Sequence, residues 1–119
     1  MKLIIAVIRP ERLEAVQHEL VTVLDEGDSY RLTVRPVEGH GRQQGEVEYV
    51  RGQRVQSRMV SRVEITVGVN DQYVEPAIDA IIRGARSGAN GQVGDGKIFV
   101  VPLDDCIRIR TGERGGQAI

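Results

Sequence analysis

Residues 62–85 read RVEITVGVNDQYVEPAIDAIIRGA, and two hydrophobic periods follow one another within them. The first part alternates apolar and polar residues, which is typical of a strand with one buried face: Val63, Ile65, Val67 and Val69. From Val74 to Ala85, apolar residues recur every three or four positions, which is the pattern of an amphipathic helix. The stretch therefore predicts a strand followed directly by a helix that packs against it.

The amino-terminal part of the chain predicts a second strand and helix. Residues 3–8 are a continuous aliphatic run, which indicates a buried central strand. Pro10 suits the first turn of a helix, and apolar residues recur at helical spacing from there to residue 25. The remaining strands are expected over residues 30–35, over residues 97–103 and, briefly, around Ile107 and Ile109.

The order of these elements is β-α-β-β-α-β with a short carboxyl-terminal strand, which predicts an α+β fold, the ferredoxin-like split β-α-β sandwich. The two helices would cover one face of the sheet. The other face would be bare in an isolated chain, and a bare sheet face invites packing against other copies. The length of 119 residues is that of one domain, so we expect a single domain over residues 1–119.

Composition excludes several classes of partner. The chain has 16 Lys and Arg against 17 Asp and Glu, and this balance removes any whole-protein case for binding nucleic acid or an anionic membrane. Aromatic residues make up only 3% of the chain, which argues against a platform that stacks bases. The one cysteine, Cys106, allows no internal disulfide. Together with the absence of a membrane-spanning run, this predicts a soluble cytoplasmic protein.

A long connection of roughly 20 residues, 39–58, joins two predicted strands. It begins Gly39-His40-Gly41-Arg42-Gln43, where glycine lets backbone approach a ligand and Arg and Gln supply donors. Connections of this length in compact domains are usually functional or disordered, so the alternative is a floppy insertion.

A glycine-rich loop, residues 87–97, ends in Gly94-Asp95-Gly96-Lys97. Exposed backbone amides beside a lysine can cradle phosphates, although the same four residues also fit a plain turn. Further on, Arg108 and Arg110 would point to the same side of an extended segment. Two guanidinium groups on one side form a phosphate clamp, and the alternative is an edge strand protected by charge.

Taken together and in this order, the motifs resemble the PII nitrogen-regulatory family. They are Ile-Arg-Pro at residues 8–10, Gly-His-Gly-Arg-Gln-Gln-Gly at 39–45, Gly-Asp-Gly-Lys-Ile-Phe at 94–99 and Ile-Arg-Ile-Arg-Thr-Gly-Glu at 107–113. The resemblance covers essentially the whole chain. It implies a non-enzymatic signalling protein, a homotrimer that binds ATP or ADP in three clefts between subunits. Residues 39–58 would be the family's T-loop, residues 87–97 its B-loop and residues 108–119 its C-terminal loop.

The resemblance also implies a set of ligand-binding residues. The phosphates would be held by the base of the T-loop and by the B-loop: Gly41, Arg42, Gln43, Gly94, Asp95, Gly96 and Lys97. Two further cations would reach in from the neighbouring subunit, namely Arg108 and Arg110. The adenosine would lie against Val7, Thr33, Gly39 and Gly68. In many relatives the residue at Gln43 ligates Mg²⁺, which with ATP chelates 2-oxoglutarate, and the lysine that holds the ketoacid's carboxylate is Arg62 here.

PII proteins act through the T-loop on ammonium channels, other transporters or metabolic enzymes, so the resemblance implies contact with a membrane only through a partner transporter. This chain departs from the family pattern in places. Val55 stands where the family has its uridylylated tyrosine, and Tyr49 lies elsewhere in the loop. About three extra residues lie around 89–91 and about four at 25–31. The T-loop is rich in arginine, at 51, 54 and 58. These differences indicate a divergent PII-like branch.

Two other classes of function are the alternatives. A ferredoxin-like metal- or small-molecule-binding module would need clustered ligands, and His40 with Glu46 and Glu48 is a weak set. A small acylphosphatase-like enzyme would need an Arg–Asn site that the sequence does not offer. The two histidines, His18 and His40, belong to no evident catalytic set.

Overall fold

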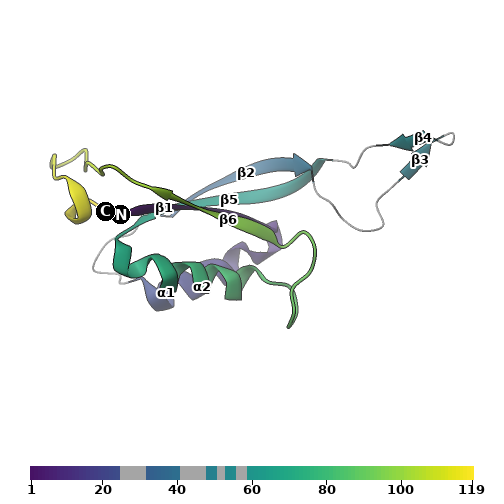
Figure 1. Ribbon diagram of the computed structural model, residues 1–119, viewed down its shortest axis with the longest axis horizontal. Coiled ribbons are helices and arrows are strands. Elements are labelled where there is room, and N and C mark those ends of the chain that lie inside the picture. Colours follow the sequence, from purple (N-terminus) through teal and green to yellow (C-terminus); the bar gives the residue numbers. More distant parts are fainter. Residues whose placement is uncertain (25–31, 41–47, 51–52, 56–58) are drawn as a thin grey trace.

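The computed structural model describes residues 1–24, 32–40 and 59–119 and, in backbone only, 48–50 and 53–55. One antiparallel sheet has the strand order β2-β5-β1-β6 (Figure 1). Its strands are β1 (Lys2–Ile8), β2 (Thr33–His40), β5 (Met59–Val69) and β6 (Gly96–Pro102). Because β5 lies between β1 and β2, and β1 lies between β5 and β6, the two βαβ halves interleave. The predicted ferredoxin-like split β-α-β fold is confirmed.

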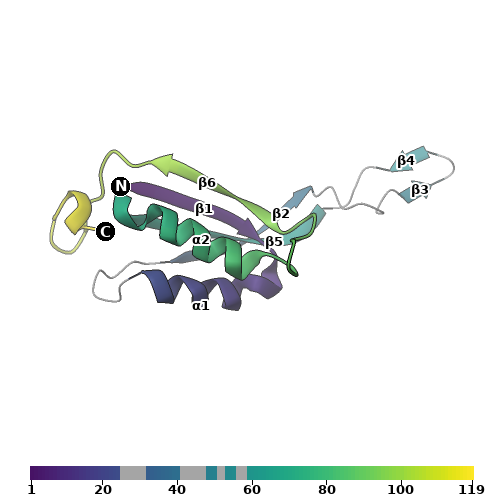
Figure 2. The same cartoon turned by 60° about the horizontal axis from the view of Figure 1, so that its bottom comes forward.

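Both helices lie on one face of this sheet (Figures 1 and 2). The 3-10 turn η1 (Pro10–Arg12) leads into α1 (Leu13–Val23), and η3 (Asp71–Tyr73) leads into α2 (Val74–Ala85). The helices come closest at Gly84, where an added Cβ would lie 2.6 Å from Val16 Cα. Only a residue without a side chain permits this approach.

The core lies between the two helices and the inner face of β1 and β5. The buried sheet residues are those that the sequence pattern places on one face: Ile4, Ala6, Ile8, Ile65, Val67 and Val69. The helices contribute Val16, Leu20, Ala77, Ala80 and Ile81. Burial of each large aliphatic side chain contributes about 1.5–3 kcal/mol, so this layer dominates the stability of the fold.

The outer face of the sheet is apolar and is not covered by α1 or α2. Along β1 it carries Leu3, Ile5 and Val7, which are only partly buried. Beside them on β6, Phe99 is 50% exposed, and it lies opposite Ile5 in the strand register. An apolar sheet face of this kind marks a surface that packs against something else.

The region between β2 and β5 differs from the prediction. β2 extends through His40, and a separate antiparallel pair, β3 (Glu48–Val50) with β4 (Gln53–Val55), lies within the stretch expected to be loop. Three-residue strands are too short for alternation to reveal them.

No helix among the described residues is long and apolar enough to cross a membrane.

The short carboxyl-terminal strand expected around Ile107 and Ile109 is reduced to a single bridge. Ile107 pairs with Arg114, and the chain turns over residues 109–111. The Gly112 N–H donates to the Arg108 carbonyl at 2.7 Å, which closes this turn. Gly112 has φ +74°, a conformation that glycine adopts readily and that breaks an extended strand.

Candidate functional site

One end of the sheet gathers the first group of predicted ligand-binding residues. β1 ends and β6 begins there, so Val7 lies opposite Lys97 in the register. Gly39, near the end of β2, lies opposite Val60, near the start of β5. The glycine-rich loop that joins α2 to β6 also lies at this end (Figures 1 and 2). It brings Gly94, Asp95 and Gly96 next to Lys97, whose side chain is exposed.

The opposite end of the sheet holds a second group. Gly68 lies opposite Leu3, at the start of β1, and Thr33 lies opposite Thr66, at the start of β2. Beyond Pro102, where β6 ends, the chain continues at this end into the hairpin of residues 107–114, which carries Arg108 and Arg110 (Figure 1).

Lys97 and Arg108 are too far apart to bind the same phosphate within one chain. On β1, the ends are marked by Val7 and Leu3, which are separated by about 13 Å at roughly 3.3 Å per residue. The glycine-rich loop extends past one end and the carboxyl-terminal hairpin past the other (Figure 1). A site that uses both Lys97 and Arg108 therefore needs two copies of the chain.

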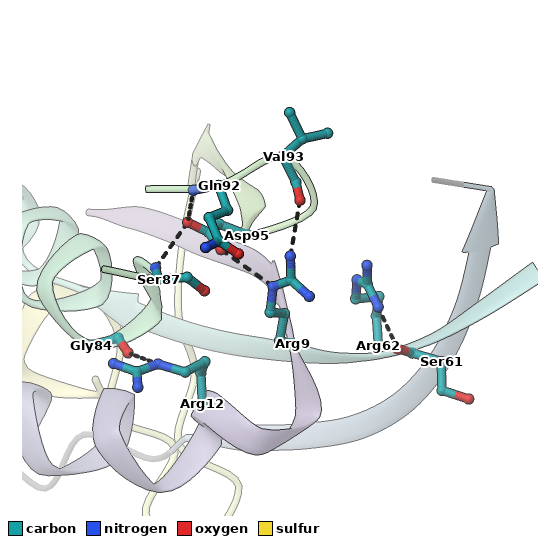
Figure 3. A network of polar contacts seen from close by, with 9 residues as sticks. All are labelled: Arg9, Arg12, Ser61, Arg62, Gly84, Ser87, Gln92, Val93 and Asp95. Atoms are coloured by element: carbon teal, nitrogen blue, oxygen red, sulfur yellow. Dashed lines mark hydrogen bonds and ion pairs between the residues drawn. The ribbon is translucent and has the colours of Figure 1, made fainter. Parts of the chain in front are cut away.

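A hydrogen-bond network holds the glycine-rich loop in shape (Figure 3). The Asp95 carboxylate accepts from the backbone N–H of Ser87 at 2.9 Å and of Gln92 at 2.8 Å. Its other oxygen accepts from Arg9 Nε at 3.2 Å, and Arg9 Nη2 donates to the Val93 carbonyl at 2.9 Å. Positive φ angles at Gly88, Gly91, Gly94 and Gly96 let the chain turn back on itself between these contacts.

These contacts lower the pKa of the Asp95 carboxyl. Partial burial acts to raise the pKa of the Asp95 carboxyl, but the hydrogen bonds from Ser87, Gln92 and Arg9 outweigh it and hold the pKa far below its usual range. The carboxylate is therefore charged at every physiological pH.

We expect the loop contacts of Asp95 to be insensitive to pH from 8 down to about 4. Because the pKa is lower in the folded state than in the unfolded state, the stabilisation is fully present above the unfolded value of about 3.9 and is lost as pH falls through the folded value. Backbone amide shifts of Ser87 and Gln92, followed by NMR during an acid titration, would check this. A transition in their shifts between pH 5 and 7 would contradict it.

A second aspartate organises the carboxyl-terminal hairpin. Asp105 pairs with Arg114 at 2.7 Å and accepts from the backbone N–H of Cys106 at 2.8 Å and of Gly115 at 3.0 Å. The Arg114 hydrogen bond is the main cause that lowers the pKa of the Asp105 carboxyl. From this hairpin, Arg108 Nη2 donates at 3.1 Å to the carbonyl of Gln117, which lies after the hairpin in the chain.

The hairpin differs from the extended segment that the sequence predicts for Arg108 and Arg110. Arg108 and Arg110 were expected to project together from an extended segment, but Arg110 lies in the turn of residues 109–111. The side chain of Arg108 is one-third exposed and also lies 3.5 Å from the Glu113 carboxylate. A ligand clamped by Arg108 would share it with these internal partners.

The remaining predicted positions are Arg62 and those at the base of the T-loop. Arg62 lies on the outer face of β5, opposite Val37, and its Nη1 donates to the Ser61 carbonyl at 2.9 Å. The predicted residues Gly41, Arg42 and Gln43, and with them the Mg²⁺ ligand, lie outside the described residues. So do Arg51 and Arg58, while Arg54 and Val55 are described in backbone only.

A cavity of about 350 Å³ lies on the helix side of β6, below the glycine-rich loop. Its walls are aliphatic, including Ile78, Ile82 and Ile98, and its rim carries Arg86, Asp95 and Lys97. Val7 and Gly39 lie on the outer face of the sheet, so this cavity is separate from the predicted adenosine position. Among the residues that the structure describes, no cluster of His, Cys, Asp or Glu could hold a metal ion. Of the weak set His40, Glu46 and Glu48, Glu46 lies outside these residues and Glu48 is described in backbone only.

Sequence reasoning missed Arg9, Ser87, Gln92 and Asp105 as loop-organising residues. Arg9 was noted only as part of the Ile-Arg-Pro motif. An arginine at the end of a central strand can be expected to lie near a neighbouring loop, but no spacing rule links position 9 to position 95. The contact becomes visible only when β1 and β6 pair.

The chain is similar to known proteins over essentially its whole length. The family model "Nitrogen regulatory protein P-II" matches residues 1–113. The chain is 47% identical to the nitrogen regulatory protein GlnK1 of Methanosarcina mazei, over all of this chain and 97% of that protein. It is 43% identical to the nitrogen regulatory protein P-II of Azospirillum brasilense, over the full length of both. A crystal structure of Arabidopsis thaliana PII bound to citrate superposes with a TM-score of 0.75 at 34% identity, and the match covers 99% of this chain and 91% of that one.

The fold and its two loop-bearing ends are those of a small signalling protein of the split β-α-β class. The chain belongs to the P-II family of nitrogen regulatory proteins. Proteins of this family are regulators rather than enzymes, which confirms the prediction of a non-enzymatic signalling protein and excludes the acylphosphatase alternative.

Proposed function

We propose that this P-II protein is a homotrimer that binds ATP or ADP in the clefts between its subunits. One observation carries the proposal: the predicted nucleotide residues divide between opposite ends of the sheet, with Lys97 at one end and Arg108 beyond the other. A head-to-tail arrangement of copies around a closed ring brings the two ends together at each contact. The cations and backbone amides of both copies then surround one polyphosphate.

The outer face of the sheet supports the trimer. Leu3, Ile5, Phe99 and Val101 form an apolar band on it, and Phe99 and Val101 are 50% and 41% exposed. Beside the band, on β2 and β5, Arg35 and Glu64 form an ion pair at 2.9 Å. Packing three such faces together would remove this surface from water. The glycine-rich loops and the hairpins would remain at the edges of the assembly, where ligand can enter.

The second ligand of the proposed site is a carboxylate. The Arabidopsis relative is described with bound citrate, and Arg62 offers a planar pair of donors suited to a carboxylate group. In this proposal Gln43 ligates Mg²⁺ beside the phosphates and 2-oxoglutarate binds the metal. Arg62 replaces the family's lysine and has the larger head group, so it favours a different carboxylate geometry.

The output of the proposed sensor is the T-loop, residues 39–58. Occupancy of the cleft would change the loop at its base, and the loop would contact a transporter, an ammonium channel or a metabolic enzyme in the cytoplasm. Control by uridylylation is not part of the proposal, since Val55 replaces the modified tyrosine.

Calorimetry with the purified chain tests the proposal. We expect ATP and ADP to bind with a Kd on the order of 1 μM, with one nucleotide per chain. Titrations with Mg²⁺ and ATP together, followed by 2-oxoglutarate or citrate, would identify the carboxylate. Light scattering should give three times the mass of one chain. Flat titrations with both nucleotides, or a monomer at all concentrations, would reject the proposal.

A further inference from the structure

Arg9 connects the end of β1 to the glycine-rich loop, although it is not among the predicted ligand residues. Its Nε donates to Asp95 Oδ1 at 3.2 Å and its Nη2 donates to the Val93 carbonyl at 2.9 Å (Figure 3). The two side chains are only 18% and 17% exposed, so water screens their ion pair less than a surface pair. One guanidinium thus holds the loop at both a side chain and the backbone.

Asp95 uses both of its oxygens within the loop. Oδ2 accepts from Ser87 N–H at 2.9 Å and from Gln92 N–H at 2.8 Å, while Oδ1 accepts from Arg9. The carboxylate therefore faces the inside of the loop. Gly91 lies close to it, since an added Cβ there would lie 3.3 Å from Oδ2. A carboxylate that has turned inward in this way is not presented to a ligand.

We propose that Arg9 and Asp95 are positioning residues, which hold residues 87–96 in the conformation that binds phosphate and do not themselves touch the nucleotide. The inference rests on the proposed function for its phosphate part. Asp95 was predicted to lie near the phosphates, and in this inference it instead holds the loop together through hydrogen bonds inside it. Arg9 supports the loop from the end of β1, a role that the Ile-Arg-Pro motif alone does not suggest.

The reason lies in the cost of ordering glycine. The loop has four glycines with positive φ, and each has more conformational freedom to lose than any other residue. If the loop were ordered only on binding, that loss would be subtracted from the affinity for the nucleotide. The contacts of Arg9 and Asp95 fix the loop before the ligand arrives, so its backbone amides are already in place.

Charge makes the inference testable by the direction of the effect. Asp95 carries a negative charge in a loop proposed to hold phosphates, so by charge alone its removal should strengthen the binding of an anionic ligand. If the carboxylate instead holds the loop in its binding conformation, its removal should weaken the binding of the same ligand. Asp95→Asn keeps the shape of the side chain but places an amide where three donors converge. Removal of the negative charge should strengthen ATP binding, whereas loss of the hydrogen bonds that hold the loop should weaken it, so the direction of the change distinguishes them.

The experiment compares Asp95→Asn and Arg9→Lys with wild type. Arg9→Lys keeps the positive charge but loses the fork that reaches two acceptors. Glu19→Gln is the matched control, since it also changes a carboxylate to an amide and breaks an arginine pair, the one with Arg83 at 3.1 Å between the two helices. ATP affinity is measured by calorimetry, and adenosine affinity by NMR shift titration.

We expect Asp95→Asn to weaken ATP about tenfold and Arg9→Lys to weaken it several-fold, while adenosine changes by less than about twofold, because only the phosphates rely on the loop. Glu19→Gln should change neither ligand. Unchanged or tighter ATP binding by Asp95→Asn would overturn the inference. So would an equal loss of ATP and adenosine affinity, because that would indicate a general change in the fold.

Hydrogen exchange on the ligand-free protein separates this inference from the proposed function. The amides of Ser87 and Gln92 should exchange about tenfold faster in Asp95→Asn than in wild type, whereas core amides of β1 should not change. Unchanged exchange would reject the inference even if ATP binds. If wild type binds no ATP, the proposed function fails, and with it the phosphate part of the inference.

Discussion

Gly96→Ala should destabilise the protein by about 2–6 kcal/mol, since backbone strain and overpacking each cost about 1–3 kcal/mol. Gly96 has φ +115°, a conformation that residues with side chains rarely adopt, and an added Cβ would overlap the Val7 carbonyl oxygen and lie 2.9 Å from the Val7 carbonyl carbon. These are backbone atoms of a central strand, so they cannot swing aside. The start of β6 would have to separate from β1.

The effect is large because the total stability of a domain is only about 5–15 kcal/mol. Urea unfolding followed by circular dichroism would measure it. Gly88→Ala is the matched control, because Gly88 also has positive φ, at +65°, but no atom lies within 4 Å of its added Cβ. We expect a loss of only about 1 kcal/mol there. Equal losses in the two variants would show that the close approach of Gly96 to Val7 is not what matters.

Mixing two inactive variants should restore ATP binding. In the proposed trimer, each cleft takes Lys97 from one copy and Arg108 from the next. Lys97→Ala and Arg108→Ala should each weaken ATP about 30-fold or more when every chain carries the change, because a charged hydrogen-bond partner of the phosphates is lost. A ring that contains both kinds of chain has one contact at which an intact Lys97 faces an intact Arg108.

Refolding the two variants together should therefore recover one site of wild-type affinity in every mixed trimer, and calorimetry would detect it. The control mixes Lys97→Ala with the double variant Lys97→Ala and Arg108→Ala, which contains no intact Lys97 and should recover nothing. If the first mixture remained inactive although native mass spectrometry showed mixed trimers, Lys97 and Arg108 would not meet between neighbouring copies. Recovery in the control would show that Lys97 is dispensable.

Local patterns predicted the sheet and helices well because burial imposes a period on the sequence. The alternation at residues 63–69 and the helical spacing at 74–85 match the buried faces of β5 and α2. The prediction was less accurate in the carboxyl-terminal region. The strand expected around Ile107 and Ile109 is a single bridge, because Gly112 turns the chain and Asp105 holds the hairpin through contacts with Cys106, Arg114 and Gly115.

The sequence predicts the parts of the candidate site but not their layout. The sequence singles out Lys97, Arg108 and the glycine-rich loop as suited to phosphate. It does not say that Lys97 and the glycine-rich loop lie at one end of the sheet while Arg108 lies beyond the other end. Strand order and register decide this placement. A site that used both Lys97 and Arg108 would need a second copy because of that separation.

The amino-acid sequence by itself determined which faces are buried, which loops are rich in glycine and which family the chain resembles, because these depend on residues close together in the chain. Only the tertiary structure decided that Arg9 meets Asp95, 86 positions away, and that α1 and α2 both lie on one face of the sheet and leave the outer face uncovered by them. Contacts between distant positions depend on how strands pair, and no local period records that pairing.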